Sequence, residues 1–213
     1  MFTELLPAWA AHYGLVEVDE SNDLSAERLL TGYRSGMFPW NDEDMPVCWW
    51  SPDPRAIFEL NGFRASRRLW RTYRSGKFQL TINRAFGAVI RGCARRPGEG
   101  TWITPAMLVA YERMHELGHA HSVEAWQDGE LAGGIYGVAV GGLFAGESMF
   151  YRRRDASKVS LLHLVLLLRD HGFSLFDTQF VTEHTTRMGA IEIPRAEYLL
   201  RLRQAIRLPA SFV

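Results

Sequence analysis

The polar residues best placed for chemistry in this sequence are a carboxylate and an amide two residues apart, Asp177 and Gln179, in the segment SLFDTQ. Side chains at positions i and i+2 of a β-strand lie on one face, so we expect these two to point the same way. Their neighbours Leu175, Phe176 and Phe180 are apolar. A carboxylate and an amide in apolar surroundings can orient a nucleophile and polarise its proton. A buried, hydrogen-bonded pair that only ends the strand fits the same pattern, and both interpretations stay open.

A further carboxylate, Glu147, lies inside the glycine-rich apolar segment GGIYGVAVGGLFAGESMF. Glycine packs no side chain within a strand, so six glycines from Gly133 to Gly146 indicate that other groups approach this backbone closely. An unpaired carboxylate beside apolar residues is costly, so Glu147 requires backbone amides or an incoming cation as its partner. The segment is either an ordinary pair of core strands or the floor of a pocket.

The sequence HELGH, from His115 to His119, matches the H-E-x-x-H pattern of zinc peptidases. That chemistry needs both histidines on one face of a continuing helix, with the glutamate as general base. Gly118 stands at the expected end of the helix, and His121 falls in an extended segment beyond it. We therefore expect a helix C-terminus, where histidines favour the helix dipole, and no metal centre.

Local patterns predict the elements that position these residues. Ser25 is an N-cap for a short helix, and Pro105 stands at the first position of a helix that ends near Gly118. The Asp128-Gly129 turn joins two strands of a hairpin, and GLFAGESMFY, SKVSLLHLVLLLRD and SLFDTQ read as strand, helix and strand. This order resembles the core of the GNAT-like N-acetyltransferase fold. Acyl-CoA enzymes of that fold hold a pyrophosphate on a glycine-containing loop at the helix entry, where this chain has YRRRDAS.

The composition indicates a globular protein. Of the 213 residues, 47% are hydrophobic and 23% are charged, enough to build one large domain with a small appendage. No apolar run reaches the roughly 18 residues of a membrane helix, and the N-terminus lacks the pattern of a secretory signal. Cys48 and Cys93 form neither a disulfide framework nor a metal knuckle. These features favour a cytoplasmic protein.

The formal net charge of zero conceals a strong asymmetry. Residues 1–59 contain eleven acids and three bases, whereas residues 61–98 contain ten bases and no acid. The basic stretch reads as two helices, SRRLWRTYRSG and RAFGAVIRGCARR, on either side of the strand FQLTIN. Cations without acidic partners repel one another, and a polyanion would neutralise them because phosphate contacts release counterions. The pattern favours nucleic-acid binding over a basic surface without a partner.

The segment MFPWNDEDMPVCWWSPDPR is rigid and aromatic, with four prolines and the tryptophans Trp40, Trp49 and Trp50. These tryptophans form either the core of a small domain or a stacking surface for a base, worth ~1–3 kcal/mol per base. The sequence alone does not separate the two.

Taken together, these segments resemble the leucyl/phenylalanyl-tRNA–protein transferases. The matching stretches cover most of the chain from Asp23 to Leu202 and are specific as a set: DLSAERLL, GMFPW, WWSPDPR, EGTWIT, HELGHAHSVEAW, GGIYGVAVGGLFAGESMF, ASK, LFDTQ and HTTRMGAIEIPRAEYL. The resemblance implies an α+β protein with a small N-terminal α/β domain, residues 1–57, and a C-terminal GNAT-like catalytic domain, residues 58–213. That second domain has a mixed β-sheet flanked by helices. The resemblance also implies a cytoplasmic, monomeric enzyme without a cofactor.

Enzymes of this family transfer Leu or Phe, and Met less well, from aminoacyl-tRNA to proteins with an N-terminal Arg or Lys. The product enters the N-degron (N-end rule) pathway of protein degradation. The donor ester is already activated, and alignment of the reactants can lower the barrier by ~7–11 kcal/mol. A GNAT-type acyl-CoA N-acyltransferase and a non-catalytic tRNA-binding module are the alternatives, and the second would not need Asp177 and Gln179.

The resemblance also implies roles for single residues. Asp177 and Gln179 match the catalytic pair, with Asp177 polarising Gln179. The aminoacyl-adenosine end of the donor is expected to contact Trp40, Trp102, Ile135, Phe144, Glu147, Met149 and Phe176, the two tryptophans holding the adenosine. The basic segment, residues 64–96, is expected to hold the tRNA acceptor stem through Arg64, Arg67, Arg68, Arg71, Arg74, Lys77, Arg84 and Arg91. Glu147 and Asp177 are both candidates for binding the acceptor's N-terminal Arg or Lys.

Overall fold

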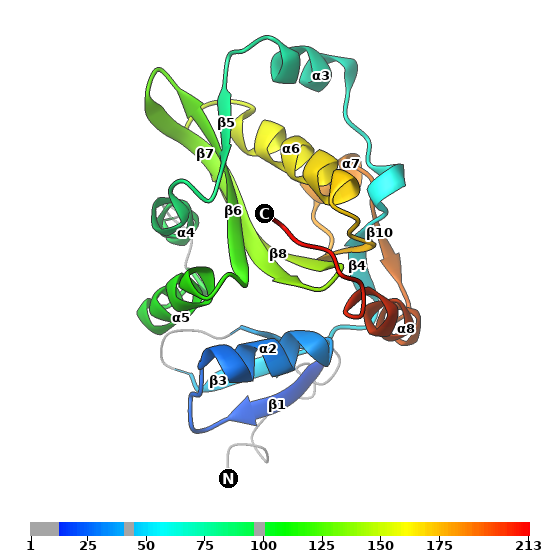
Figure 1. The fold of residues 1–213 in the computed structure, drawn as a ribbon. Coiled ribbons are helices and arrows are strands. Elements are labelled where there is room, and N and C mark those ends of the chain that lie inside the picture. The colour runs from blue at the N-terminus through cyan, green and yellow to red at the C-terminus, as the bar shows by residue number, and fades with distance from the viewer. Residues whose placement is uncertain (1–12, 41–44, 96–100) are drawn as a thin grey trace.

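The computed structural model describes residues 13–40, 45–95 and 101–213 (Figure 1). Residues 1–12 of the expected N-terminal domain and Arg96 of the basic segment lie outside the described residues. In the described part of the chain, no helix combines the length and the apolar character needed to cross a membrane.

The N-terminal part forms a small antiparallel sheet with one helix packed on it. Its strands are β1 (Leu15–Asp19), β2 (Phe38–Pro39) and β3 (Val47–Trp50), in the order β1-β3-β2. Ser25 is the N-cap of the helix α2 (Ala26–Arg34), as predicted. Its hydroxyl accepts a hydrogen bond from the backbone amide of Arg28. This helix can approach the sheet because Gly32 has no side chain: a Cβ there would lie 2.2 Å from the ring of Trp49.

The rest of the chain forms a seven-stranded mixed sheet. Its strands are β4 (Arg55–Phe58), β5 (Gln79–Ile82), β6 (Ala120–Gln127), β7 (Glu130–Val140), β8 (Leu143–Tyr151), β9 (Leu175–Gln179) and β10 (Ala190–Ile193). The strand order is β10-β4-β9-β8-β7-β6-β5. All neighbours are antiparallel except β8 and β9, which are parallel. The helix α6 (Ala156–Asp170) is the crossover that parallel strands require, and the predicted order of hairpin, strand, helix and strand is confirmed.

Helices cover both faces of this sheet. The remaining ones are the short 3₁₀ helix η2 (Leu60–Gly62), α3 (Arg67–Arg74), α4 (Phe86–Ala94), α5 (Pro105–Glu116), α7 (Glu183–Arg187) and α8 (Arg195–Ala205). Figure 1 shows α4 and α5 on one side of the sheet and α6 on the other. Two neighbouring glycines of β7 allow this close packing: a Cβ on Gly133 would meet Ala156 of α6 at 2.8 Å, and one on Gly134 would meet Val89 of α4 at 3.0 Å.

These observations confirm the predicted fold class, α+β with a small N-terminal part and a C-terminal mixed sheet flanked by helices. The expected domain boundary at residue 57 falls inside β4, which pairs with β9 and β10 of the large sheet. The small sheet itself ends at Trp50. One buried apolar cluster extends from Trp49 through Tyr111 to Tyr198, so the two parts are packed against each other.

The HELGH segment forms a helix end. Helix α5 stops at Glu116, and the amide of His119 bonds to the carbonyl of Met114. His115 contacts the carbonyl of Ala120 through Nδ1 at 2.8 Å. The two histidines therefore do not share a face of a continuing helix, which the zinc-peptidase geometry requires.

Candidate active site

Two adjoining cavities open where β8 and β9 separate. The parallel pairing ends at Ala145 and Asp177, after which β8 continues along β7 alone. The larger cavity, about 630 Å³, is lined mainly by aromatic residues that include Phe38, Trp40, Trp50 and Trp102. The smaller cavity, about 170 Å³, is lined by apolar residues that include Phe58, Ile135, Met149, Leu161 and Phe176. The wall common to both consists of Glu147, Thr178, Gln179, Phe180 and Thr182.

Among the six glycines of the predicted pocket floor, Gly146 lines a cavity. It stands where the two strands part, and a Cβ there would lie 2.9 Å from the ring of Phe176. Gly137 has a different role, because a Cβ at that position would lie 2.2 Å from the carbonyl oxygen of Ala145. The glycine-rich segment thus combines the two interpretations: most of it is closely packed core, and its end forms a pocket wall.

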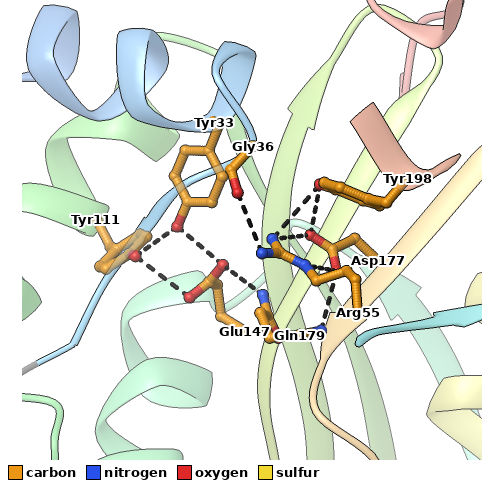
Figure 2. Close-up of polar contacts among 8 residues, drawn as sticks. All are labelled: Tyr33, Gly36, Arg55, Tyr111, Glu147, Asp177, Gln179 and Tyr198. Carbon is orange, nitrogen blue, oxygen red and sulfur yellow. Dashed lines mark hydrogen bonds and ion pairs between the residues drawn. The ribbon is translucent and has the colours of Figure 1, made fainter. Parts of the chain in front are cut away.

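Glu147 is held by two tyrosines from distant parts of the chain (Figure 2). The hydroxyl of Tyr33, on α2, lies 2.8 Å from Oε1, and the hydroxyl of Tyr111, on α5, lies 3.3 Å from Oε2. The two hydroxyls are 2.6 Å from each other. On the cavity side, Nε2 of Gln179 donates to Oε1 at 3.2 Å.

This arrangement favours the neutral form of Glu147. Burial raises its pKa to about 8, an effect that a hydrogen bond from Tyr33 partly offsets. The three contacts among Glu147, Tyr33 and Tyr111 need three protons. The two hydroxyls supply two, and a protonated carboxyl supplies the third. A positive group that entered the cavities would shift the balance toward the carboxylate.

Asp177 is fully buried, and its carboxylate oxygens accept hydrogen bonds from other protein groups (Figure 2). Arg55 makes a bidentate pair with it, Nε to Oδ1 at 2.8 Å and Nη2 to Oδ2 at 2.6 Å. The hydroxyl of Tyr198 donates to Oδ2 at 2.9 Å. Arg55 also donates to the carbonyl of Gly36, which ties the turn after α2 to this cluster. Asp177 lines neither cavity.

Of the expected pair, Gln179 lines both cavities and Asp177 lines neither, although both take part in the network of Figure 2. The register between β4 and β9 shifts at this point, and Gln179 takes a left-handed conformation with φ 58°. Its backbone amide donates to Asp177 Oδ1 at 2.9 Å, while its side chain reaches Glu147 in the cavity wall. Gln179 thus connects two hydrogen-bonded clusters, one around Asp177 and one around Glu147.

The other expected substrate contacts divide clearly. Trp40 and Trp102 line the larger cavity; Ile135, Met149 and Phe176 line the smaller one; Glu147 lines both. Phe144 does not line either cavity, because its ring is 1% exposed and packs against Phe176 and Phe212 in the core. The tryptophan-rich segment also serves two purposes: Trp49 is buried core, whereas Trp40 is 40% exposed at the cavity.

The expected tRNA-contacting cations are all at the surface: Arg64, Arg67, Arg68, Arg71, Arg74, Lys77, Arg84 and Arg91. Most belong to α3 or its flanks, at the top of Figure 1, whereas Arg91 is on α4. Within the described residues, two of them are paired with carboxylates, Arg68 with Asp155 at 2.8 Å and Arg91 with Glu112.

Sequence reasoning missed four residues that hold the site together: Tyr33, Arg55, Tyr111 and Tyr198. Each contacts Glu147 or Asp177 from an element far away in the sequence. The signal available was indirect. A carboxylate within an apolar segment requires polar partners, but the segment does not indicate which residues supply them.

The sheet has a single parallel pair joined by α6, and a cavity opens where its two strands separate, which is the arrangement expected of a GNAT-like fold. A family model described as "Leucyl/phenylalanyl-tRNA protein transferase" matches residues 57–203, and one for the N-terminal domain of the same family matches residues 22–53. The chain is 52% identical to the leucyl/phenylalanyl-tRNA–protein transferase of Solidesulfovibrio magneticus over 202 residues, which cover 93% of this chain and 81% of that protein. It is also 52% identical to the enzyme of the same name from an Anaeromyxobacter species over 206 residues, covering 95% of this chain and 87% of that protein.

The chain therefore belongs to the leucyl/phenylalanyl-tRNA–protein transferase family, and it is an aminoacyltransferase. Among solved structures, L-PGS from Bacillus licheniformis aligns with a TM-score of 0.41 at 14% identity, covering 76% of this chain and 55% of that one.

Proposed function

We propose that this enzyme moves Leu or Phe, and Met less well, from aminoacyl-tRNA to the α-amine of proteins with an N-terminal Arg or Lys, which directs them to the N-degron pathway. The observation that carries the proposal is the pair of cavities with a common polar wall. One cavity is broad and aromatic, the other is small and apolar, and Glu147 and Gln179 stand between them. An aminoacyl-adenosine has this same division into a flat base, an apolar side chain and a reactive ester between them.

In this assignment the larger cavity takes the terminal adenosine. Trp40 and Trp102 supply the faces on which a base stacks, worth ~1–3 kcal/mol. The smaller cavity takes the aminoacyl side chain against Ile135, Met149 and Phe176. Such an apolar cavity discriminates by only ~1–3 kcal/mol per methylene, which suits an enzyme that accepts both Leu and Phe. Rejection of β-branched side chains would come from the shape of the wall near Ile135 and Met149.

The reaction exchanges an ester for an amide. The acceptor amine attacks the ester carbonyl carbon, a C–N bond forms, the bond to the ribose oxygen breaks, and the proton lost by nitrogen ends on that oxygen. Gln179 is placed to orient the amine, because it lines both cavities and its Oε1 accepts no hydrogen bond from the described residues. Asp177 is a positioning residue that fixes the backbone of Gln179 through the amide. Glu147 binds the α-ammonium of the donor's aminoacyl group.

We further propose that the exposed cations of α3 and its flanks contact the acceptor stem, and that the enzyme acts in the cytoplasm as a monomer without a cofactor. An acyl-CoA donor is disfavoured by the entry of α6. There the chain has no glycine, and the N-cap residue Asp155 brings a carboxylate, paired with Arg68, to the helix end on which such enzymes hold a pyrophosphate.

The direct test is transfer of labelled Leu from Leu-tRNA to a peptide that begins with Arg. We expect transfer with and without a chelator, and none to the same peptide when its α-amine is acetylated. Trp102→Ala should raise KM for the donor. Failure of the parent protein to label the Arg-initiated peptide would overturn the proposal, and failure only after chelation would overturn the metal-free mechanism.

A further inference from the structure

One hydroxyl in the wall between the two active-site cavities has no protein partner. Oγ1 of Thr178 is buried and makes no hydrogen bond within the described part of the chain. Thr178 belongs to the wall common to both cavities, and it stands between Asp177 and Gln179 in the sequence. Proteins satisfy most of their buried polar groups, because an unsatisfied one is destabilising. An unsatisfied hydroxyl at this position is therefore a candidate for contact with a substrate.

The neighbouring strands explain why Thr178 stands apart from the regular sheet. Ile57 of β4 lies opposite Asp177, and Ala56 lies opposite Gln179. Strand β4 therefore skips Thr178. On the other side of β9, the pairing with β8 ends at Asp177. Thr178 is thus the extra residue of a β-bulge, an irregularity that turns side chains to new directions beside active sites.

The backbone around Thr178 is fixed by hydrogen bonds. Its carbonyl accepts a hydrogen bond from the amide of Phe180 at 2.6 Å, and the amide of Gln179 donates to Oδ1 of Asp177 at 2.9 Å. The side chain keeps one freedom, rotation about χ1 between staggered positions. Such a rotation changes the direction of the hydroxyl without breaking a hydrogen bond to any described residue, because the hydroxyl makes none.

The other polar side chains of the common wall are already engaged. Nε2 of Gln179 donates to Oε1 of Glu147 at 3.2 Å. The hydroxyl of Thr182 lies 3.1 Å from the hydroxyl of Thr185 and also accepts the amide of Thr185, as part of the cap of α7. Among the described residues of this wall, Thr178 therefore has the hydroxyl that can donate to a ligand without losing a protein partner.

Aminolysis of an ester requires a hydrogen-bond donor at the carbonyl oxygen. As the amine nitrogen bonds to the carbonyl carbon, an electron pair moves onto that oxygen. The pair returns when the bond to the ribose oxygen breaks, and the proton from nitrogen ends on the ribose oxygen. A hydroxyl that donates to the carbonyl oxygen keeps its own proton throughout and stabilises the transient negative charge.

The position of Thr178 suits this donor role better than that of a nucleophile. A threonine oxygen that attacked the ester would need a base within hydrogen-bond distance, and Oγ1 contacts none among the described residues. In the transferase function proposed above, on which this inference rests, the ester lies between the two cavities against their common wall. We propose that Thr178 is a catalytic residue whose hydroxyl donates a hydrogen bond to the ester carbonyl oxygen as that oxygen becomes negative.

The test is the nearly isosteric change Thr178→Val in the full chain, which replaces the hydroxyl by a methyl group. We expect kcat for transfer to an Arg-initiated peptide to fall about 100-fold, since loss of one such donor lowers kcat by about 10²–10³. KM for aminoacyl-tRNA should stay within about twofold, because the contact strengthens only in the transition state. Thr178→Ser keeps the hydroxyl and should retain kcat within about threefold.

Two controls separate the hydroxyl from the fold. Thr31→Val makes the same change at an exposed position of α2 and should leave kcat within about twofold of the parent. The melting temperature of Thr178→Val should equal or exceed that of the parent, because the change removes an unsatisfied polar group. A loss of turnover with that stability does not come from misfolding.

A binding measurement tests the same contact without turnover. The phosphonate analogue of the aminoacyl-adenosine ester has a negative, tetrahedral centre, whereas the amide analogue is planar and uncharged there. In calorimetric titrations, the parent should bind the phosphonate at least about tenfold more tightly than Thr178→Val does. The two proteins should bind the amide analogue within about twofold of each other.

Three results would overturn the role of Thr178: a kcat of Thr178→Val within about twofold of the parent, equal losses in Thr178→Val and Thr178→Ser, or a change confined to KM for aminoacyl-tRNA. A parent protein that labels no Arg-initiated peptide would overturn the proposed function instead. The phosphonate titration would still decide the role of the hydroxyl, because equal affinity in parent and Thr178→Val would refute it.

Discussion

The buried pair of Arg55 and Asp177 yields the sharpest prediction, because we propose that the Asp177 carboxylate acts by positioning Gln179. Asp177→Asn removes one charge of a pair whose side chains are each 1% exposed. The guanidinium remains in the core without a counter-charge, and one donor of the new amide faces another donor. Breaking a buried pair in this way costs about 3–5 kcal/mol.

For a chain of this length, each kcal/mol shifts the melting temperature by about 2–4 °C, so we expect a decrease of about 6–20 °C. Urea unfolding followed by fluorescence of the seven tryptophans would give the free energy of unfolding. Glu192→Gln makes the same carboxylate-to-amide change at an exposed position on β10 and should cost under about 0.5 kcal/mol.

A second variant tests the cause. Arg55→Met/Asp177→Asn removes the unpaired charge as well, so it should be more stable than Asp177→Asn alone, although it loses the bond from Arg55 to Gly36. The reasoning would be refuted if Asp177→Asn kept its unfolding free energy within about 1 kcal/mol of the parent while turnover fell by orders of magnitude. That result would show that the carboxylate acts on the reacting atoms.

Three further predictions concern the cavity wall. Glu147 has its pKa raised to about 8, so the folded protein binds one more proton than the unfolded chain between about pH 4.5 and 8, and stability from this group falls as pH rises through that window. In thermal melts across that pH range, Glu147→Gln should remove the part of the stability loss that Glu147 causes. An equal loss of stability in parent and variant would contradict the raised pKa of Glu147. Trp40→Ala should raise KM for aminoacyl-tRNA roughly tenfold with kcat little changed. An unchanged KM in steady-state transfer assays would show that the adenine base does not bind against Trp40 in the larger cavity. Ile135→Ala should enlarge the smaller cavity and shift kcat/KM from Leu toward Phe by roughly tenfold, whereas a shift toward Leu would place the side chain elsewhere.

Local patterns were sufficient for much of the fold. The N-cap at Ser25, the helix start at Pro105 and the stop before Gly118 are decided by residues within one turn, and each is where the sequence predicted it. The hairpin at Asp128-Gly129 also depends on adjacent residues, both of which take positive φ. Signals of this kind are readable because the groups that cause them are neighbours in the sequence.

The site was harder to predict for a physical reason. Alternation along a strand did not indicate that Arg55 and Tyr198 enclose Asp177 while Gln179 reaches the cavity wall, at the point where the register against β4 shifts and Gln179 takes a left-handed conformation. The apolar pattern of β8 likewise did not indicate that Phe144 packs into the core while Met149 reaches the cavity. Both outcomes depend on where β8 and β9 separate, which is a property of the assembled sheet.

The same network explains how the two parts of the chain act together. Tyr33 and the carbonyl of Gly36 come from the N-terminal part, yet they bind Glu147 and Arg55 of the large sheet. Two polar side chains of the large sheet, the partly buried Glu147 and the buried Arg55, thus receive hydrogen-bond partners from α2 and from the turn after it. Because a buried polar group without a partner costs about 1–3 kcal/mol, the large sheet on its own would hold its active-site wall less firmly. The N-terminal part therefore contributes aromatic lining to the larger cavity and also holds Glu147, which faces that cavity, through Tyr33.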